Sequence, residues 1–482
     1  MTIALGLSFA ISTATGVLLL WLVWPRATTW HWPLALGLGA GLGAGLSAVL
    51  LFFWMLAFGP TRGFPLAEAA LLLLAGAAAA RGGRLVTFES PVGRNGRRGS
   101  RQYLLLGTAF LVTLGAAVAA FLSILRQHPH GEWDAWMNWD LRARMFYRGG
   151  DGWLNAFSAA IPWSHPDYPV LLPSLVARTW LYTGTETLLG PALVAGTFTF
   201  ATVALLASAV GALRTPTQGL LAGLVLLSIP FFLVHGTSLY ADVPVAFFFL
   251  ATFVCLALDD RYGGARNRFA ILAGVAAGFG MWTKNEGLLF MLAAAAGLLL
   301  VAVGGGWRAS RGRLLAFATG LLPMLLLTAG FKIAFAPPND LLSTLGLERT
   351  VARLTDWHRY YLVLRAYASH ILWFGNNGFG SVTWVLAAYV LGLGLSPAES
   401  RRSWVRAATA TLLLLLAGHF VVFVSMADEL ARLLRSSLDR LLLQLWPSAL
   451  FLFFMAVRAQ EETEAARLPL ERAGEPGSRV AA

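Results

Sequence analysis

Cysteine is almost absent from this sequence, and charge is scarce. The one cysteine, Cys255, lies in an apolar run, so the chain offers no disulfide framework and no cysteine-based metal site. Only 12% of the 482 residues are charged and 57% are hydrophobic, a balance that soluble globular proteins do not show. No positive segment precedes the first apolar run, so we expect no secretory signal peptide. The composition indicates a protein that crosses a membrane many times.

Apolar runs of spanning length recur along the chain. A helix of roughly 20 apolar residues crosses a bilayer, and about thirteen runs meet this criterion. We therefore predict an all-α fold, a polytopic transmembrane helix bundle with interfacial helices in its outer loops. The spans are expected near residues 3–24, 33–58, 64–80, 103–125, 187–213, 219–233, 243–258, 269–282, 287–303, 314–335, 379–395, 407–424 and 441–457.

Short basic loops set the expected orientation. Segment 81–102 contains six Arg and one Glu, and three further short loops are rich in Arg. All four fall on one side if the spans alternate, and the positive-inside rule makes that side the cytoplasm. Orientation then explains the net charge of +12, so we expect membrane lipids and no nucleic acid as partners. The polar end, 458–482, is predicted to be a disordered cytoplasmic tail. The three further loops carry Arg261, Arg266 and Arg268; Arg308, Arg311 and Arg313; and Arg401, Arg402 and Arg406.

The longest polar interruption, 126–170, falls on the outer side and contains five Trp residues. Trp133, Trp136 and Asp140 follow helical spacing, which predicts an interfacial helix over 132–147 with its Trp side chains at headgroup level. A second interfacial helix is expected over 349–373.

Two acidic residues, Glu132 and Asp134, follow directly after a span. A carboxylate there can take a proton from an acceptor hydroxyl or amine, which is general-base catalysis at a membrane surface. A solvated turn explains the same two residues equally well.

The motif SHPDYP, 164–169, follows in the same loop. Its two prolines restrict the backbone around His165, Asp167 and Tyr168, which favours a site, although a structural turn is an equal alternative. His128, His130 and His165 show no recognised metal-ligand spacing, so no metal ligand is assigned. Whether Mg²⁺ or Mn²⁺ assists as a cofactor stays open.

Several later outer turns each carry a few polar residues. Because they return to the same membrane face, we expect one shared polar site. Lys284 and Arg440 suit a phosphate or pyrophosphate held where water is scarce. The other candidate substrate-binding residues in these turns are Tyr240, Asp242 and Glu286.

The motifs EWDAWMNWDLRARMFY, HPDYP, SLYADVPVAFFFL, TKNEGLL and SSLDRLLLQLWP, in this order, resemble the polytopic glycosyltransferases of the GT-C fold. That class includes protein O-mannosyltransferases, lipid A aminoarabinose transferases and bacterial lipopolysaccharide core glycosyltransferases. The resemblance covers roughly 103–457, the expected catalytic membrane domain. Residues 1–102 would then be three extra N-terminal spans and a basic loop.

The resemblance implies a residue-level assignment. Asp134 would be the catalytic base, with Glu132 second, and Arg440 would contact donor phosphate with help from Lys284. His165, Asp167 and Tyr168 would lie near the donor and acceptor sites. Asp140, Tyr240, Asp242 and Glu286 complete the expected substrate-binding set.

The implied activity is inverting transfer of a sugar from a polyprenyl-phosphate donor to a lipid or glycan acceptor. The implied location is the inner membrane of a bacterium, with the active site facing the periplasm. A ligase or polymerase that uses a polyprenyl-diphosphate glycan is one alternative, and a lipid or solute transporter is another. Transporters place polar residues at the midplane on broken helices, whereas the acids here concentrate in outer loops. His419 is interpreted as a helix–helix hydrogen-bonding group.

Overall fold

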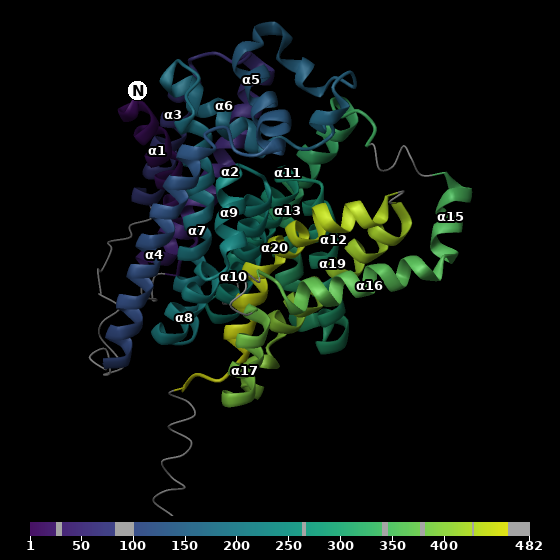
Figure 1. Ribbon diagram of the computed structural model, residues 1–482. Helices are drawn as coiled ribbons and strands as arrows, with labels where there is room; N and C mark the ends of the chain where they lie inside the picture. Colours follow the sequence, from purple (N-terminus) through teal and green to yellow (C-terminus); the bar gives the residue numbers. More distant parts are fainter. Residues whose placement is uncertain are drawn as a thin grey trace, which may run out of the picture.

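The computed structural model describes residues 1–25, 31–81, 101–262, 267–339, 346–375, 381–426 and 429–460, and within them the regular elements are helices (Figure 1). Residues 82–100 of the predicted basic loop, Arg266, and most of the predicted tail lie outside these ranges. The helices are α1 (Thr2–Val23), α2 (Trp32–Phe58), α3 (Phe64–Arg81), α4 (Arg101–Gln127), α5 (Asp140–Arg148), α6 (Leu171–Thr183), α7 (Leu189–Leu213), α8 (Pro216–Leu227), α9 (Pro230–Thr237), α10 (Asp242–Tyr262), α11 (Arg268–Thr283), α12 (Glu286–Gly305), α13 (Trp307–Ala334), α15 (Leu347–Thr355), α16 (Trp357–Leu372), α17 (Val382–Leu393), α18 (Pro397–Ser400), α19 (Ser403–Met426) and α20 (Leu430–Ala456), with a π-helical turn η1 (Ala135–Trp139) and 3-10 turns η2 (Gly150–Phe157) and η3 (Pro162–Ser164).

Ten of the described helices are long and apolar enough to cross a membrane, or eleven if α8 and α9, which meet at 65°, form one span. Each of the thirteen predicted runs coincides with a helix or with this bent pair. Two of them, α11 and α17, have only 16 and 12 residues, so helix length confirms a polytopic bundle without deciding the span count. The predicted helix over 349–373 is broken at Asp356 into α15 and α16.

Helix α10 forms the centre of the bundle. Its apolar window is completely buried, and it packs against α7, α11 and α20. The sequence explains this position because α10 is apolar on every side, which suits a helix surrounded by other helices. Its first residue, Asp242, therefore lies at the centre of the bundle, at one end of α10.

A buried ion pair joins the N-terminal spans to α6. Arg178 Nε lies 2.8 and 2.9 Å from the two carboxylate oxygens of Glu68 on α3. The Tyr182 hydroxyl donates to Glu68 at 2.7 Å, and Arg178 also donates to the carbonyl of Ser8 on α1. Helix α6 was not predicted, because Pro173, Ser174 and Arg178 interrupt its apolar pattern. The buried charge of Arg178 is tolerated because α3 supplies Glu68 as its partner.

The two ends of the bundle differ in chemistry. At one end, Arg313 Nε lies 3.1 Å from Asp259 and Arg402 Nη1 lies 2.9 Å from Asp260, so the end of α10 meets the starts of α13 and α19. The N-terminus and α5 lie at the opposite end (Figure 1). Since Asp242 begins α10, it lies toward the α5 end, away from these basic segments.

Candidate functional site

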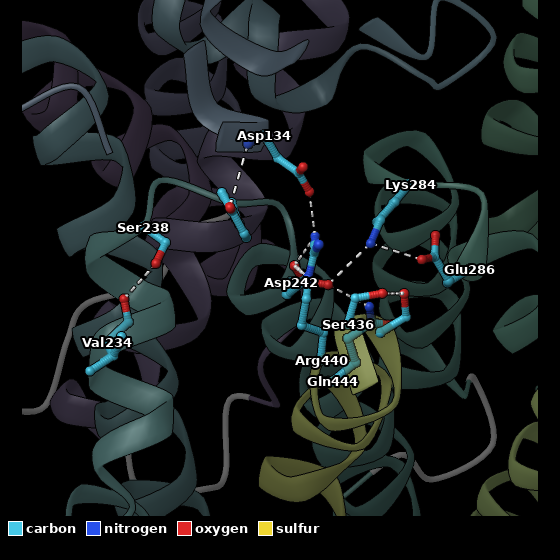
Figure 2. Close-up of polar contacts among 11 residues, drawn as sticks. Asp134, Val234, Ser238, Asp242, Lys284, Glu286, Ser436, Arg440 and Gln444 are labelled. Carbon is cyan, nitrogen blue, oxygen red and sulfur yellow. Dashed lines mark hydrogen bonds and ion pairs between the residues drawn. The ribbon is translucent and has the colours of Figure 1, made fainter. Parts of the chain in front are cut away.

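Arg440, in the first half of α20, lies between two carboxylates from distant segments. Its Nη2 donates to Asp134 at 2.7 Å and to Asp242 at 2.9 Å, and its Nε donates to Asp242 at 3.1 Å (Figure 2). Asp134 precedes η1, Asp242 begins α10, and Arg440 belongs to α20. Three of the residues proposed from sequence therefore meet at one point.

Lys284 extends this cluster to the turn between α11 and α12. Its Nζ lies 3.1 Å from Asp242 and 2.8 Å from Glu286 (Figure 2). Burial lowers the pKa of Lys284, but attraction to Asp242 and Glu286 outweighs burial and raises that pKa above its usual value. Gln444 also donates to the fully buried Asp242, at 2.7 Å. Three carboxylates thus face two cations in a compact network.

A cavity of about 440 Å³ opens beside this network, within the size range of small-molecule sites. Six predicted residues line it: Asp134, His165, Tyr168, Lys284, Glu286 and Arg440. The other lining side chains form two groups. The polar or aromatic group comprises Asn138, Trp139, Asn285, Asn339, His419 and Ser437. The apolar group comprises Leu289, Val422, Phe423, Leu433 and Leu441.

The turn with HPDYP forms one wall of the cavity. Arg142, fully buried on α5, donates to the carbonyls of Tyr168 at 2.7 Å and His165 at 3.4 Å. Burial lowers the pKa of Arg142 to about 9, although the charge of Asp167 opposes that effect. His165 has a positive φ of 46° and stacks on the Tyr168 ring, with centroids 4.9 Å apart. Arg142 therefore fixes a backbone that few side chains favour.

Asp167 lies behind this wall and does not line the cavity. It accepts from the Asn285 amide at 2.8 Å and from the Asn339 amide at 2.6 Å. Lys332 of α13 also donates to the Asp167 carbonyl and, at 2.8 Å, to the Asn285 amide oxygen. Asp167 thus orients two amides that do line the cavity.

The two candidate bases occupy different surroundings. The Asp134 side chain is 29% exposed and lines the cavity. Glu132 is 54% exposed, lies 3.6 Å from His128, and is not among the lining residues. The Tyr240 hydroxyl accepts from the Asp134 backbone N–H at 3.4 Å, and its ring lies 4.6 Å from the Arg440 guanidinium. The geometry favours Asp134 over Glu132.

Asp140 is placed apart from the cavity, although it belonged to the expected substrate-binding set. It begins α5, is 2% exposed and does not line the cavity. Burial raises the pKa of Asp140 to about 7, partly offset by Arg144 one turn away. Its position is that of a buried titratable group behind the site.

The comparisons found no match. Neither family models, nor curated proteins, nor solved structures resemble the chain significantly. The site is therefore interpreted from its own geometry. In the part of the chain that the structure describes, no group of three or more His, Cys, Asp or Glu side chains could hold a metal ion.

Sequence reasoning missed several polar residues of the cavity. His419 was expected to bond a neighbouring helix, but its buried Nε2 has no hydrogen-bond partner and the residue lines the cavity. Asn138 Oδ1 and Glu286 Oε2 are also buried there without partners. Buried polar atoms normally find hydrogen-bond partners, so these three atoms mark atypical packing in the cavity wall. An ionisable residue within an apolar run was the available signal for His419.

Proposed function

We propose that this protein is a membrane glycosyltransferase that moves a sugar from a polyprenyl-phosphate donor to a lipid or glycan acceptor. The observation that carries the proposal is Arg440 held between Asp134 and Asp242, beside Lys284, at the edge of the cavity. It combines a proton acceptor with two cations that suit a phosphate.

The cavity walls suit the two ends of such a donor. Leu289, Val422 and Phe423 form an apolar surface for the first prenyl units of the donor. Contact between the prenyl chain and these side chains removes apolar surface from water, which is favourable. Asn138, Asn285 and Asn339 offer amides to sugar hydroxyls. Tyr168 adds ring surface to the cavity wall.

In the proposed reaction an acceptor oxygen attacks the anomeric carbon from the face opposite the phosphate. The new carbon–oxygen bond forms as the bond from that carbon to the phosphate oxygen breaks, which inverts the configuration. The acceptor proton passes to the Asp134 carboxylate. The electron pair leaves with the polyprenyl phosphate, whose charge Arg440 and Lys284 stabilise.

The charge balance of the cluster suggests how donor binding prepares the base. Asp134, Asp242 and Glu286 outnumber Lys284 and Arg440, so both cations are already paired with carboxylates. A donor phosphate that binds Arg440 takes the place of Asp134, the more exposed of its two partners. Release from Arg440 frees the Asp134 carboxylate, so the base can accept a proton when the donor is present.

The basic segments at one end of the bundle support a proposed location. We place the Arg313 and Arg402 end in the cytoplasm and the α5 end in the periplasm of a bacterial inner membrane. A lipid-linked donor would then reach the cavity from the outer leaflet.

The test is transfer of radiolabelled sugar from a panel of polyprenyl-phosphate donors in membranes that contain the wild type or Asp134→Asn. We expect donor-dependent labelling that falls by about 10²–10⁴-fold in the variant. Asp151→Asn, an exposed acid of the same loop, is the matched control and should keep full activity. A wild type that consumes no polyprenyl-phosphate sugar, or only a diphosphate-linked glycan, would reject the proposal.

A further inference from the structure

A second cavity, of about 290 Å³, lies against α20 and shares no lining residue with the first. Its lining comes from α9, from the end of α16 and from Asp439 of α20. Asp439 directly precedes Arg440, and successive residues of a helix point about 100° apart. Helix α20 therefore presents Arg440 to the first cavity and Asp439 to the second.

A hydrogen-bonded His–Asp pair lies in this second cavity. His370 Nδ1 lies 2.5 Å from Asp439 Oδ1, and the two side chains are 25% and 39% exposed. With Nδ1 engaged by the carboxylate, the ring offers Nε2 as its remaining polar atom. Asp439 lies nine residues after Leu430, ~14 Å along α20, one turn beyond Arg435 and Ser436 on the same helix face.

The rest of the lining suits a neutral, hydroxylated ligand. Trp373, half exposed, offers a ring face, and Ser369 offers a hydroxyl. Among the described residues that line this cavity there is no Lys or Arg, and Asp439 balances any charge on His370. A phosphate would find no Lys or Arg among these lining residues, whereas a sugar ring can stack on Trp373 and exchange hydrogen bonds with His370.

A continuous row of packed rings separates the two cavities. Phe231 of the second cavity lies 4.0 Å from the His235 ring, His235 lies 5.9 Å from Tyr240, and Tyr240 packs 4.6 Å from Arg440. The Tyr240 hydroxyl in turn contacts the Asp134 backbone. A group bound at His370 therefore lies on the opposite side of α20 and Tyr240 from a group bound at Lys284.

We propose that the His370–Asp439 cavity binds an uncharged, hydroxyl-rich part of the acceptor that is remote from its reacting hydroxyl. This inference rests on the proposed glycosyl transfer, in which the first cavity holds the donor. His370 and Trp373 would be binding residues that select the acceptor, with no part in the proton transfer at Asp134.

The binding test uses the purified full-length chain and equilibrium dialysis with radiolabelled methyl glycosides of glucose, galactose and mannose as probes. We expect saturable binding of at least one probe, weakened about tenfold or more in His370→Ala and Trp373→Ala. His370→Gln keeps a hydrogen-bonding amide beside Asp439 and should recover much of the affinity. His358→Ala, an exposed histidine on the same helix, is the matched control. Thermal unfolding midpoints confirm that each variant is folded.

The kinetic test varies donor and acceptor separately. His370→Ala should raise the acceptor KM about tenfold or more and leave the donor KM unchanged. The inference is overturned if the wild type binds no probe, or if binding is lost in Trp139→Ala of the first cavity and kept in His370→Ala. An unchanged acceptor KM in His370→Ala would overturn it as well, while glycosyl transfer stands. Conversely, probe binding at His370 without any sugar transfer would retain the site and reject the transferase.

Discussion

Arg440 and Asp134 are 306 residues apart in the sequence, yet Nη2 of Arg440 lies 2.7 Å from Oδ2 of Asp134. The same nitrogen also contacts Asp242, which is completely buried. Asp134 is the candidate base and Arg440 the candidate residue that binds phosphate. Their contact couples proton transfer to donor binding, because a ligand that binds Arg440 changes the surroundings of Asp134.

Arg440→Met should weaken donor binding more than any other change on α20. Loss of charge-assisted hydrogen bonds of about 1.5–3 kcal/mol corresponds to roughly 10–150-fold in donor KM. Arg435→Met, an exposed arginine of the same helix, is the matched control and should change donor KM less than about twofold. Equal effects of the two variants would show that Arg440 has no special role, and steady-state kinetics at fixed acceptor measures the difference.

Arg178→Met should destabilise the protein strongly. It leaves Glu68 buried without its cation, because both side chains are only 2% exposed, and breaking such a pair costs about 3–5 kcal/mol. Thermal unfolding in a fixed detergent measures the effect. Arg432→Met is the control, since Arg432 and Glu429 are 79% and 71% exposed. The double variant Glu68→Leu with Arg178→Met should recover stability, and a double variant as unstable as the single one would contradict this account.

Asp140 should make stability fall as pH rises toward neutrality. Its pKa is about 7 in the folded chain against 3.8 for the free side chain, because burial disfavours the carboxylate. Between these values the folded state holds a proton that the unfolded state releases, so this stabilisation is complete below pH ~4 and lost as pH rises through ~7. Asp140→Asn should flatten the unfolding midpoint between pH 5 and 8. Parallel pH profiles for wild type and variant would refute the assignment.

Gly43→Ala should loosen the packing of α1 on α2. A Cβ at Gly43 would meet the Ser12 carbonyl at 1.8 Å, so the helices must separate, at a cost of about 1–3 kcal/mol. Gly107→Ala on α4 is the matched control, since nothing lies within 4 Å of its Cβ position. Alanine favours helices, so the control should be neutral or slightly stabilising. A Gly43 variant as stable as the Gly107 variant would mean that α1 does not approach this closely.

The helical fold could be predicted from the sequence because an apolar run of spanning length forms a transmembrane helix. In lipid every backbone polar group must find a partner within the chain, and a helix satisfies all of them locally. The positions of α1, α4 and α12 follow from this rule. Helix α6 escaped prediction because Arg178 looks unfavourable until Glu68 of α3 is beside it.

Much of the candidate site was also visible in the sequence, since charged residues beside apolar spans are scarce and costly. The sequence predicts six site residues that line one cavity: Asp134, His165, Tyr168, Lys284, Glu286 and Arg440. Side-chain direction was not visible. The π-helical turn η1 follows Asp134, and only the folded chain shows that Asp134 lines the cavity while Glu132 remains exposed.

The sequence by itself determined an all-helical membrane protein, because hydrophobic length and backbone hydrogen bonding are local properties. Only the tertiary structure decided that Asp167 orients Asn285 and Asn339, that His419 lines the cavity, and that His370 meets Asp439 on the far side of α20. His370 and Asp439 are 69 residues apart in the sequence, and Asp167 and Asn339 are 172 residues apart. Only the packing of the helices brings such distant residues into contact. No local pattern records which faces of two helices will meet.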